Sequence, residues 1–576
     1  MWLNQYLNPR HTFRPVQRLS QCACAVGAIA LPLLMAVLFV SPTQAAERIR
    51  FQYGLLGLSI TRENLETFAE TGSLECSVRS ILSRLSPDAR EQLRAVLQAR
   101  YDVDPVMVNR FSYTRPGYQL LTEIGELIQT DSGQNGFYGL RAALTLAASD
   151  PNGLTILNFI EQFPTDIRID VGQALAIADD LEDLFSETQQ AINQLAEETQ
   201  AIAAQEPAFE GQSLTDPRQP GAATPTVQTL LLQDEARDRT IAVDFYLPEL
   251  EPDVQNPQQL PIIVISNGLG ARRTRFDELA IHLTSHGFAV AMLDHPGSDR
   301  QRLLEFNQGL HSENFDATEF VDRPLDVSFL LDELMRLNRD TFGDRLDMSR
   351  VGIFGYSFGG TTALALAGAE PDFEHLAEDC ATQSGLLNIS LLYQCRALEV
   401  SRPWPNVRDE RIQAVYVFVP FSRSLYGPEG MAQVRTPVFW EATEHDILTP
   451  LTIEQLPVFS WLAHPETDTE KETEANTDTE AGPPNDASES NGDRYLAVAS
   501  GLPHARLTLD VLNRLNNEAI AWETIKPIAE TYHQMLSLTF FQVHLAGHDA
   551  YRPFLQARGM QYLSEESHPI YWRSGQ

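Results

Sequence analysis

The chain has 576 residues, more than one hydrophobic core usually organises, so we expect two folded units with appended segments. Its composition is that of a globular protein, with 43% hydrophobic and 21% charged residues, but 78 acidic residues against 42 basic ones leave a formal net charge of -36. This acidic balance argues against nucleic acid as a partner and against electrostatic attraction to anionic membrane surfaces.

The first segment has the pattern of an export signal. Basic residues precede the apolar run Cys22–Val40, and small residues follow this run in SPTQAAER. We expect a signal peptide over residues 1–46, cleaved near Ala45 or Ala46, and hence a periplasmic or extracellular protein. The alternative is an uncleaved membrane anchor, because the apolar run approaches the length that spans a bilayer.

The segment 47–205 has a helical pattern throughout. Apolar residues recur at spacings of three and four in DAREQLRAVLQARY and PNGLTILNFIEQF, and regular strand alternation is missing from the sequence. The stretch 171–205 reads as one long amphipathic helix with an acidic face. We therefore predict an all-helical N-terminal domain without a cluster of catalytic spacing, whose default role is packing, capping or binding of a protein partner.

A stretch rich in Pro, Gly, Ser and Thr, residues 206–225, is predicted to link this domain to a second unit at 226–576. There VQTLLLQ and TIAVDFYLP read as paired strands, and short apolar strands then alternate with helical segments. That alternation predicts a largely parallel sheet covered by helices on both faces, the α/β class. The further strands are PIIVISN, FAVAMLD, RVGIFGY, IQAVYVFVP, TPVFWEA and RYLAVAS.

An acidic stretch interrupts this pattern at about residues 464–494. It almost lacks apolar residues and is rich in Asp, Glu, Thr and Pro, which predicts a disordered surface insertion. An acidic metal-binding or docking loop is the alternative.

Three cysteines follow the expected signal, namely Cys76, Cys380 and Cys395. In an oxidising compartment Cys380 and Cys395 could pair across a short loop, which would contribute about 3 kcal/mol of stability by the loop-entropy argument. Free buried thiols are the alternative.

The motif GYSFG carries the clearest chemical signal. An esterase must expose its serine hydroxyl, pair it with an imidazole and face it with donors for the developing oxyanion. In VGIFGYSFGGTTALALAG the motif lies between an apolar β-branched strand and a small-residue helix, which is typical of a nucleophile elbow. We predict Ser357 as the nucleophile; a Gly-rich turn at a helix start is the alternative.

The acid and the base should follow the serine on loops after later strands. Asp446 in TEHDILTP is the predicted acid, with Glu444 as the fallback and a helix cap as the structural alternative. His504 in ASGLPHARLT is the predicted base because Gly and Pro mark the exit from the last expected strand. Its rival, His548, ends an aromatic-rich helical segment and has the pattern of a packed histidine.

The oxyanion hole needs two backbone N–H groups. One should come from Phe358, the residue after the nucleophile, and the other from Leu269 in PIIVISNGLGARRTRF, unless these glycines only make an ordinary turn. The full set predicts acyl transfer through an acyl-enzyme, with neither a metal nor an organic cofactor required.

Two of these segments also resemble a known family. SNGLGARRTRFDELAIHLTSHGFAVAMLDHPGS and GYSFGG are similar to the platelet-activating factor acetylhydrolase branch of the α/β-hydrolases, over roughly residues 226–560. The resemblance implies an α/β-hydrolase fold, an ester substrate of lipid-like or short-chain acyl type, and the roles given above. Asn267 departs from the family pattern, which usually carries His there, and this puts the shape of the substrate mouth in question. The N-terminal unit resembles a domain that precedes such hydrolases in cyanobacterial exported proteins.

Other functions remain open at this level. The same triad could act on thioesters, lactones, polyesters or peptides, and the expected cap at residues 372–411 would set the size of the acyl pocket unless its leucines are core. A different class of function is an exported binding or scaffold protein with an inactive hydrolase-like domain.

Overall fold

The computed structural model describes residues 45–73, 79, 82, 86–151, 153–211, 214–249, 259–462, 493–515 and 520–575. The apolar run of the expected signal, Cys76 and nearly all of the expected acidic insertion lie outside these residues. Among the helices that are described, none combines the length and the apolar character needed to cross a bilayer.

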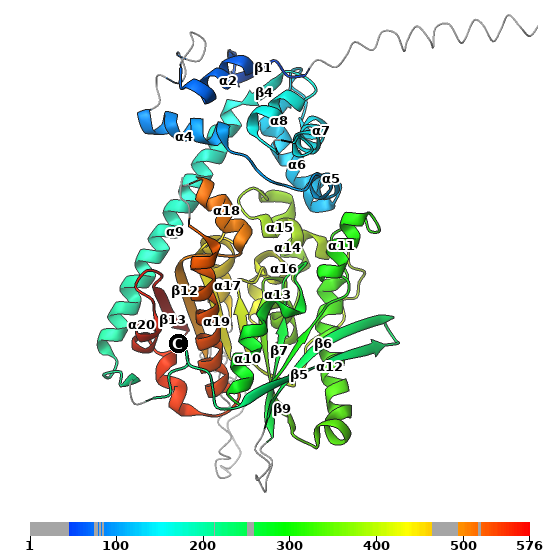
Figure 1. Cartoon of the computed structure of the whole chain (residues 1–576), viewed down its shortest axis with the longest axis vertical. Coiled ribbons are helices and arrows are strands. Elements are labelled where there is room, and N and C mark those ends of the chain that lie inside the picture. Colours follow the sequence, from blue (N-terminus) through cyan, green and yellow to red (C-terminus); the bar gives the residue numbers. More distant parts are fainter. Residues whose placement is uncertain are drawn as a thin grey trace, which may run out of the picture.

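The C-terminal unit is built on a single large sheet (Figure 1). Its nine described strands have the order β13-β12-β11-β10-β9-β7-β8-β6-β5. The six strands from β7 to β12 run parallel to one another, whereas β5, β6 and β13 are antiparallel to their neighbours. The strands are β5 (Thr224–Asp234), β6 (Arg239–Glu249), β7 (Leu260–Ser266), β8 (Ala289–Leu293), β9 (Leu346–Tyr356), β10 (Ile412–Phe418), β11 (Val438–His445), β12 (Arg494–Pro503) and β13 (Ile570–Gly575).

Helices cover both faces of this sheet. Side chains alternate across a strand, so Ile262 and Val264 of β7 face one core cluster with α12 and α13, while Ile263 and Ile265 face a second cluster with α10 and α19. Burial of β7 on both sides explains its unbroken apolar sequence. The helices of this unit are η2 (Arg273–Phe276), α10 (Asp277–Ser285), α11 (Arg300–Gln308), α12 (Glu319–Phe342), α13 (Phe358–Leu366), α14 (Phe373–Thr382), α15 (Ile389–Gln394), η3 (Cys395–Glu399), α16 (Arg423–Met431), η4 (Leu451–Gln455), α17 (Leu456–Trp461), α18 (Arg506–Leu515), α19 (Trp522–His544), η5 (Asp549–Leu555) and α20 (Ala557–Leu563).

These observations confirm the predicted α/β fold class, and each of the eight expected strand segments forms one of β5 to β12. Strand β13 was not predicted. It pairs with β12 at the edge of the sheet, and the long helix α9 (Val171–Gln205) lies beside it. The hydroxyl of Thr199 on α9 accepts the N–H of Trp572 at 2.8 Å and donates to the carbonyl of Trp572 at 3.0 Å. Helix α9, whose bounds agree with the prediction, therefore covers an edge that could otherwise pair with another chain.

The prediction of an all-helical N-terminal domain is wrong. This unit contains a four-stranded sheet in the order β2-β1-β4-β3 beside its helices. Strand β1 pairs in parallel with β4, more than a hundred residues later, and these short strands lack a regular alternation of buried and exposed residues. The elements are β1 (Arg48–Tyr53), β2 (Leu56–Thr61), α2 (Arg62–Thr71), α4 (Pro87–Gln98), α5 (Pro105–Phe111), α6 (Arg115–Leu127), β3 (Ile128–Thr130), α7 (Phe137–Ala148), α8 (Ile156–Gln162) and β4 (Ile167–Asp170).

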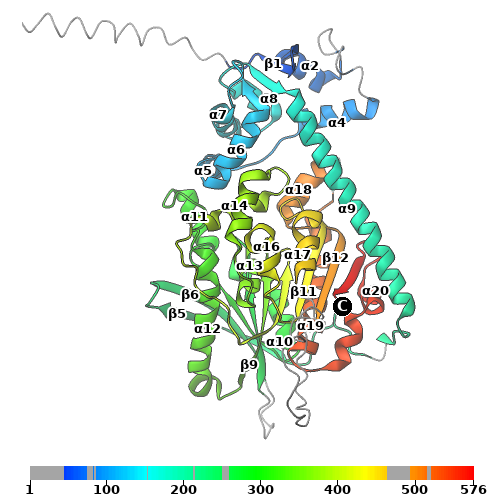
Figure 2. The same ribbon diagram turned by 180° about the vertical axis from the view of Figure 1, so that it is seen from behind.

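The N-terminal unit lies over one end of the C-terminal unit, above α14, α15 and α18, as Figures 1 and 2 show from opposite sides. The N–H of Arg115 on α6 donates to Glu313 at 3.0 Å, and the hydroxyl of Ser384 donates to Glu123 on α6 at 3.0 Å. A cavity of about 1300 Å³ lies between the two units, lined on one side by α6 and on the other by the segment 380–399.

A disulfide joins Cys380 at the end of α14 to Cys395 at the start of η3, so of the two alternatives for these cysteines the structure has the paired one. The predicted cap at 372–411 therefore contains a stapled pair of helices. Leu376, Leu391 and Leu392 are buried and Leu376 belongs to the first core cluster, whereas Leu398 is 39% exposed. The buried leucines of this segment stabilise the fold.

Candidate active site

Three predicted residues follow the carboxyl ends of parallel strands. Ser357 follows β9, Asp446 follows β11 and His504 follows β12. Because the carboxyl ends of parallel strands meet at one edge of a sheet, all three lie along the same edge. The strand register brings two of them together, since His445 and Pro503, the residues before Asp446 and His504, are paired across β11 and β12. Asp446 and His504 are therefore the next residues after a paired position, although 58 positions separate them in the chain.

Ser357 occupies a sharp turn between β9 and α13. Its backbone has φ 53° and ψ −116°, a strained conformation for a residue with a Cβ that typically marks a functional position. Two hydrogen bonds hold the turn: the N–H of Ser357 donates to the carbonyl of Phe418 at 2.9 Å, and the N–H of Gly360 donates to the carbonyl of Ser357 at 2.8 Å. The geometry is that of a nucleophile elbow.

Two glycines make this elbow possible. A Cβ at Gly355 would lie 2.3 Å from the carbonyl oxygen of Gly359, and a Cβ at Gly359 would lie 1.9 Å from the carbonyl oxygen of Ser266. Both distances are far below a van der Waals contact. The glycines of the GYSFG motif are thus required by the close packing of α13 against β7 and β9.

His504 and Asp446 form a buried pair. Nδ1 of His504 lies 2.6 Å from Oδ2 of Asp446, and only 5% of His504 and 4% of Asp446 is exposed to solvent. With Asp446 ionised, Nδ1 carries the proton and Nε2 presents its lone pair. This is the tautomer that a general base requires.

Further donors surround the carboxylate of Asp446. The N–H groups of Leu448 and Thr449 donate to Oδ1 at 2.8 and 2.9 Å, and the hydroxyl of Thr449 donates to Oδ2. Burial by itself would raise the pKa of Asp446, but the electrostatic interaction with His504 and the hydrogen bonds from His504 and Thr449 hold this pKa below its ordinary value. The carboxylate therefore stays charged beside the imidazole.

The two fallback residues lie elsewhere. Glu444 accepts hydrogen bonds from the hydroxyl of Ser500 at 2.6 Å and the N–H of Gly501 at 3.0 Å, so it braces the turn before His504. His548 follows α19 and contacts the side chain of Gln542 at 2.6 Å. It is exposed to solvent just beyond the helix end, so it is not a packed histidine, but its N–H caps the helix by donating to the carbonyl of Gln542 at 2.8 Å.

Of the two expected oxyanion donors, Phe358 directly follows Ser357 and Leu269 lies on the loop after β7. Within the part of the chain that the structure describes, the N–H groups of Leu269 and Phe358 have no hydrogen-bond acceptor. The loop of Leu269 passes close to the serine, because a Cβ built at Gly268 would be 3.3 Å from the Cβ of Ser357. Two free N–H groups beside a serine are the arrangement that binds an oxyanion.

Tyr356, the residue before the serine, contacts His504. Its ring centroid lies 5.4 Å from that of His504, and its hydroxyl donates to the carbonyl of His504 at 3.3 Å. Over the described residues, the hydroxyl of Ser357 makes no hydrogen bond, and neither does Nε2 of His504. Catalytic hydrogen bonds are often long before a substrate is bound.

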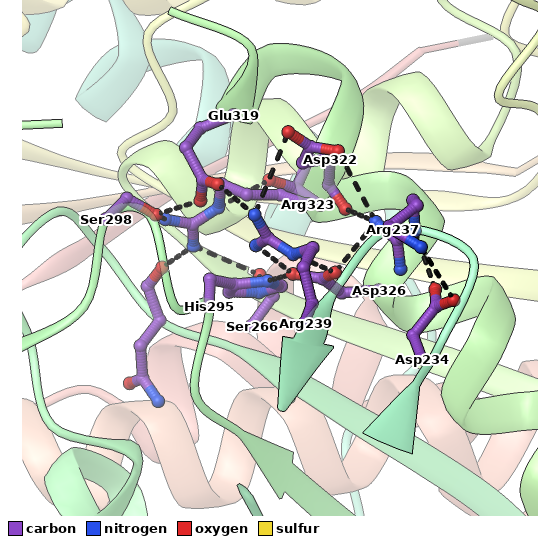
Figure 3. A network of polar contacts seen from close by, with 12 residues as sticks. Asp234, Arg237, Arg239, Ser266, His295, Ser298, Glu319, Asp322, Arg323 and Asp326 are labelled. Carbon is purple, nitrogen blue, oxygen red and sulfur yellow. Dashed lines mark hydrogen bonds and ion pairs between the residues drawn. The ribbon is translucent and has the colours of Figure 1, made fainter. Parts of the chain in front are cut away.

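Sequence reasoning missed two groups of residues at this edge. Thr449 is one, and the only available signal was its place in the turn after Asp446. The other is a buried polar network next to the oxyanion loop, drawn in Figure 3, which includes Arg323, Asp326 and His295. Nothing in the helical pattern of α12 distinguishes Arg323 from a surface arginine, yet it is 1% exposed.

Asn267, the departure from the family pattern, is 4% exposed and points into the protein. Its side-chain amide donates to the carbonyl of Arg273 at 3.2 Å, and its own carbonyl accepts from Arg323. The side chain of Asn267 therefore supports the loop from the protein interior and is not part of the exposed surface of the loop.

Comparisons with known proteins agree with this architecture. Residues 45–170 match the family described as alpha/beta hydrolase of unknown function (DUF1400), and residues 257–398 match the family described as serine aminopeptidase, S33. Platelet-activating factor acetylhydrolase of Cavia porcellus is 29% identical over 145 residues, covering 19% of this chain and 31% of that protein. The same enzyme of Canis lupus familiaris is 26% identical over 148 residues, covering 19% and 32%.

The chain thus spans about a third of the length of the curated relatives it matches. Together with the strand order and the elbow, these similarities show an α/β-hydrolase domain that resembles platelet-activating factor acetylhydrolase, as the motifs predicted. The first family match falls on the N-terminal unit, whose own sheet is separate from the hydrolase sheet.

Proposed function

We propose that this chain, with its α/β-hydrolase domain, is a serine hydrolase that cleaves carboxylic esters through an acyl-enzyme. The observation that carries the proposal is the buried His504–Asp446 pair, with 2.6 Å between Nδ1 and Oδ2, on the same sheet edge as the elbow of Ser357. An imidazole held by a carboxylate beside a strained serine has the chemistry of a triad.

In the proposed reaction, Nε2 of His504 takes the proton of the Ser357 hydroxyl as the oxygen attacks the ester carbonyl. The N–H groups of Leu269 and Phe358 bind the oxyanion, and Asp446 stabilises the imidazolium that forms. His504 then returns the proton to the leaving alcohol, which leaves an acyl group on Ser357. Water, deprotonated by His504, attacks that acyl group and releases the acid and the free serine.

The substrate class rests on the relatives. Their name describes an acetylhydrolase, so we propose short-chain or lipid-like acyl esters as substrates of this chain. Thioesters, lactones and polyesters are cleaved by the same chemistry and belong in the substrate panel.

A peptidase is the second candidate function, because residues 257–398 match a serine aminopeptidase family. Both reactions use the same acyl-enzyme, so the leaving group distinguishes them.

The chain is also proposed to be exported, on the basis of its apolar leader sequence. The disulfide between Cys380 and Cys395 supports this, since such bonds persist in oxidising compartments.

The test uses the purified chain with a fluorophosphonate probe, followed by p-nitrophenyl esters of increasing acyl length and aminoacyl p-nitroanilides. We expect the probe to label Ser357, Ser357→Ala to abolish both labelling and turnover, and short-chain esters to be the best substrates. A wild-type protein that neither reacts with the probe nor cleaves any ester would favour a binding or scaffold role and would end the proposal.

A further inference from the structure

A buried polar network lies directly behind the oxyanion loop (Figure 3). It joins the end of β7, the turn after β8, strand β6 and the first two turns of α12. Its charged side chains are largely removed from water, with exposures between 0 and 22% for those in ion pairs. The labelled residues are Asp234, Arg237, Arg239, Ser266, His295, Ser298, Glu319, Asp322, Arg323 and Asp326.

Arg323 is the member of this network that contacts both halves of the expected oxyanion hole. One Nη2 hydrogen bond goes to the carbonyl of Asn267, two residues before Leu269. Its Nε donates to the hydroxyl of Thr362 on α13 at 3.1 Å. Its guanidinium carbon also lies 4.5 Å from the ring centroid of Phe358. One planar group therefore touches the loop that carries one N–H donor and the helix that begins with the other.

The donors of Arg323 all go to neutral oxygens. Nη1 donates to the hydroxyl of Ser298 at 2.9 Å, and among the described ion pairs none involves Arg323. The nearby carboxylates of Glu319 and Asp326 bind Arg239 instead, at 2.8 and 2.7 Å. A buried guanidinium without a direct ion pair is expensive in free energy, so it is expected only where its hydrogen bonds do something that a hydrophobic side chain could not.

A second Ser–His–Asp arrangement orients one of these acceptors. Nε2 of His295 lies 3.0 Å from the hydroxyl of Ser266, and Nδ1 lies 3.0 Å from Oδ2 of Asp326. Burial, together with the charges of the neighbouring arginines, holds the pKa of His295 well below its usual range, so Ser266 donates to His295 and its oxygen faces Arg323 at 3.4 Å. Ser266 is fully buried, which removes it from any substrate.

We propose that Arg323 is a positioning residue of the oxyanion hole. By binding the carbonyl of Asn267 and the hydroxyl of Thr362 at once, it sets the separation between the N–H groups of Leu269 and Phe358. The Ser266–His295–Asp326 chain fixes the orientation of Ser266 beside it and has no part in bond cleavage. This inference rests on the proposed function, because an oxyanion hole matters only for acyl transfer.

The test compares Arg323→Lys with Arg237→Lys. Lysine keeps the charge but cannot reach both acceptors with one planar group. Arg237 belongs to the same network through Asp234 and Asp326 but touches neither Asn267 nor α13, which makes it the matched control. Each variant is assayed on an oxygen ester and on the corresponding thionoester, whose sulfur is a weaker and longer acceptor and so benefits less from the oxyanion hole.

We expect Arg323→Lys to lower kcat on the oxygen ester by about tenfold to a hundredfold, with little change in KM. This decrease in kcat is smaller than the one expected when an oxyanion donor is removed altogether. Turnover of the thionoester should fall much less, so the ratio of the two activities changes. Arg237→Lys should lower the melting temperature but keep the wild-type ratio. Equal losses on both esters in Arg323→Lys would overturn the inference, because a purely structural role affects both alike.

A second pair of variants covers the case in which Arg323→Lys does not fold. Thr362→Val removes the acceptor of Nε, whereas Thr362→Ser retains it. The valine variant should shift the activity ratio in the same direction by a few-fold, and the serine variant should restore it; equal ratios in both would overturn the inference. Fluorophosphonate labelling of the wild type distinguishes a failure of the proposed function from a failure of the inference about Arg323. An unreactive wild type would overturn both, whereas a reactive wild type with unchanged activity ratios in the variants would overturn only the inference.

Discussion

The hydroxyl of Thr449 donates a hydrogen bond to Oδ2 of Asp446, the same oxygen that lies 2.6 Å from Nδ1 of His504. The other carboxylate oxygen accepts two backbone N–H groups from the following turn. The carboxylate is therefore held in one orientation before any substrate binds. The predictions for the acid and the base depend on this arrangement.

Asp446→Asn should lower kcat by about 10⁴-fold on a short-chain ester, because the amide would favour the wrong tautomer of His504. Glu444→Gln is the matched control, since Glu444 braces Ser500 and Gly501 and does not contact the imidazole. It should keep activity near the wild-type level. Steady-state kinetics with p-nitrophenyl acetate measure both, and the reverse ranking of the two variants would transfer the acid role to Glu444.

His504→Ala should reduce kcat on the order of 10⁶-fold, the loss expected when the base of a triad is removed. His548→Ala should remain close to wild type, because His548 contacts Gln542 at a helix end. Both variants should keep the circular dichroism spectrum of the wild type. Substantial turnover by folded His504→Ala would show that another group accepts the serine proton.

The wild type should lose stability relative to Asp446→Asn as the pH falls below about 4. His504 and Thr449 hold the pKa of Asp446 below its ordinary value against the opposing effect of burial. The unfolded chain therefore binds this proton at a higher pH than the folded chain, so the contribution is complete above about pH 5 and is lost as the pH falls through the folded pKa. Urea unfolding of both proteins between pH 3 and 6 measures it, and a difference that is independent of pH would contradict the prediction.

Gly359→Ala should abolish activity and destabilise the hydrolase domain by several kcal/mol, as expected for a severe steric conflict in a core. The new Cβ would lie 1.9 Å from the carbonyl oxygen of Ser266, so α13 must move away from β7. Gly172→Ala on α9 is the control, because only the carboxylate of the N-cap Asp170 lies near its Cβ, at 3.2 Å, and alanine favours a helix. Equal melting temperatures for the two variants would argue against this packing.

Replacing Cys380 and Cys395 by serine should lower the free energy of unfolding by about 3 kcal/mol, the loop-entropy value for a separation of 15 residues. Reduction of the wild type with dithiothreitol should produce the same loss, and the variant should not respond to the reductant. Guanidinium unfolding with and without reductant measures both effects. A wild type that is insensitive to reduction would show that the two cysteines are not paired in solution.

Much of the hydrolase unit follows from local sequence patterns. An apolar strand buried on both faces, such as β7, reads as an unbroken run of β-branched residues, and the elbow of Ser357 reads as strand, glycine turn and helix. The order of Ser357, Asp446 and His504 follows from the same patterns, because each residue directly follows a strand. The expected cysteine pair was one of two open alternatives, since spacing alone does not determine whether two thiols meet.

The rest was decided by tertiary structure. Strands β1 and β4 were missed because their hydrogen bonds join segments more than a hundred residues apart, and neither strand has a periodicity of its own. Arg323 was missed because its burial is a property of the surrounding elements and not of α12. The meeting of Asp446 with His504 depends likewise on the register of β11 with β12. Sequence periodicity reports which face of one element avoids water, whereas the partner across a sheet or behind a loop is selected by the packing of the whole domain.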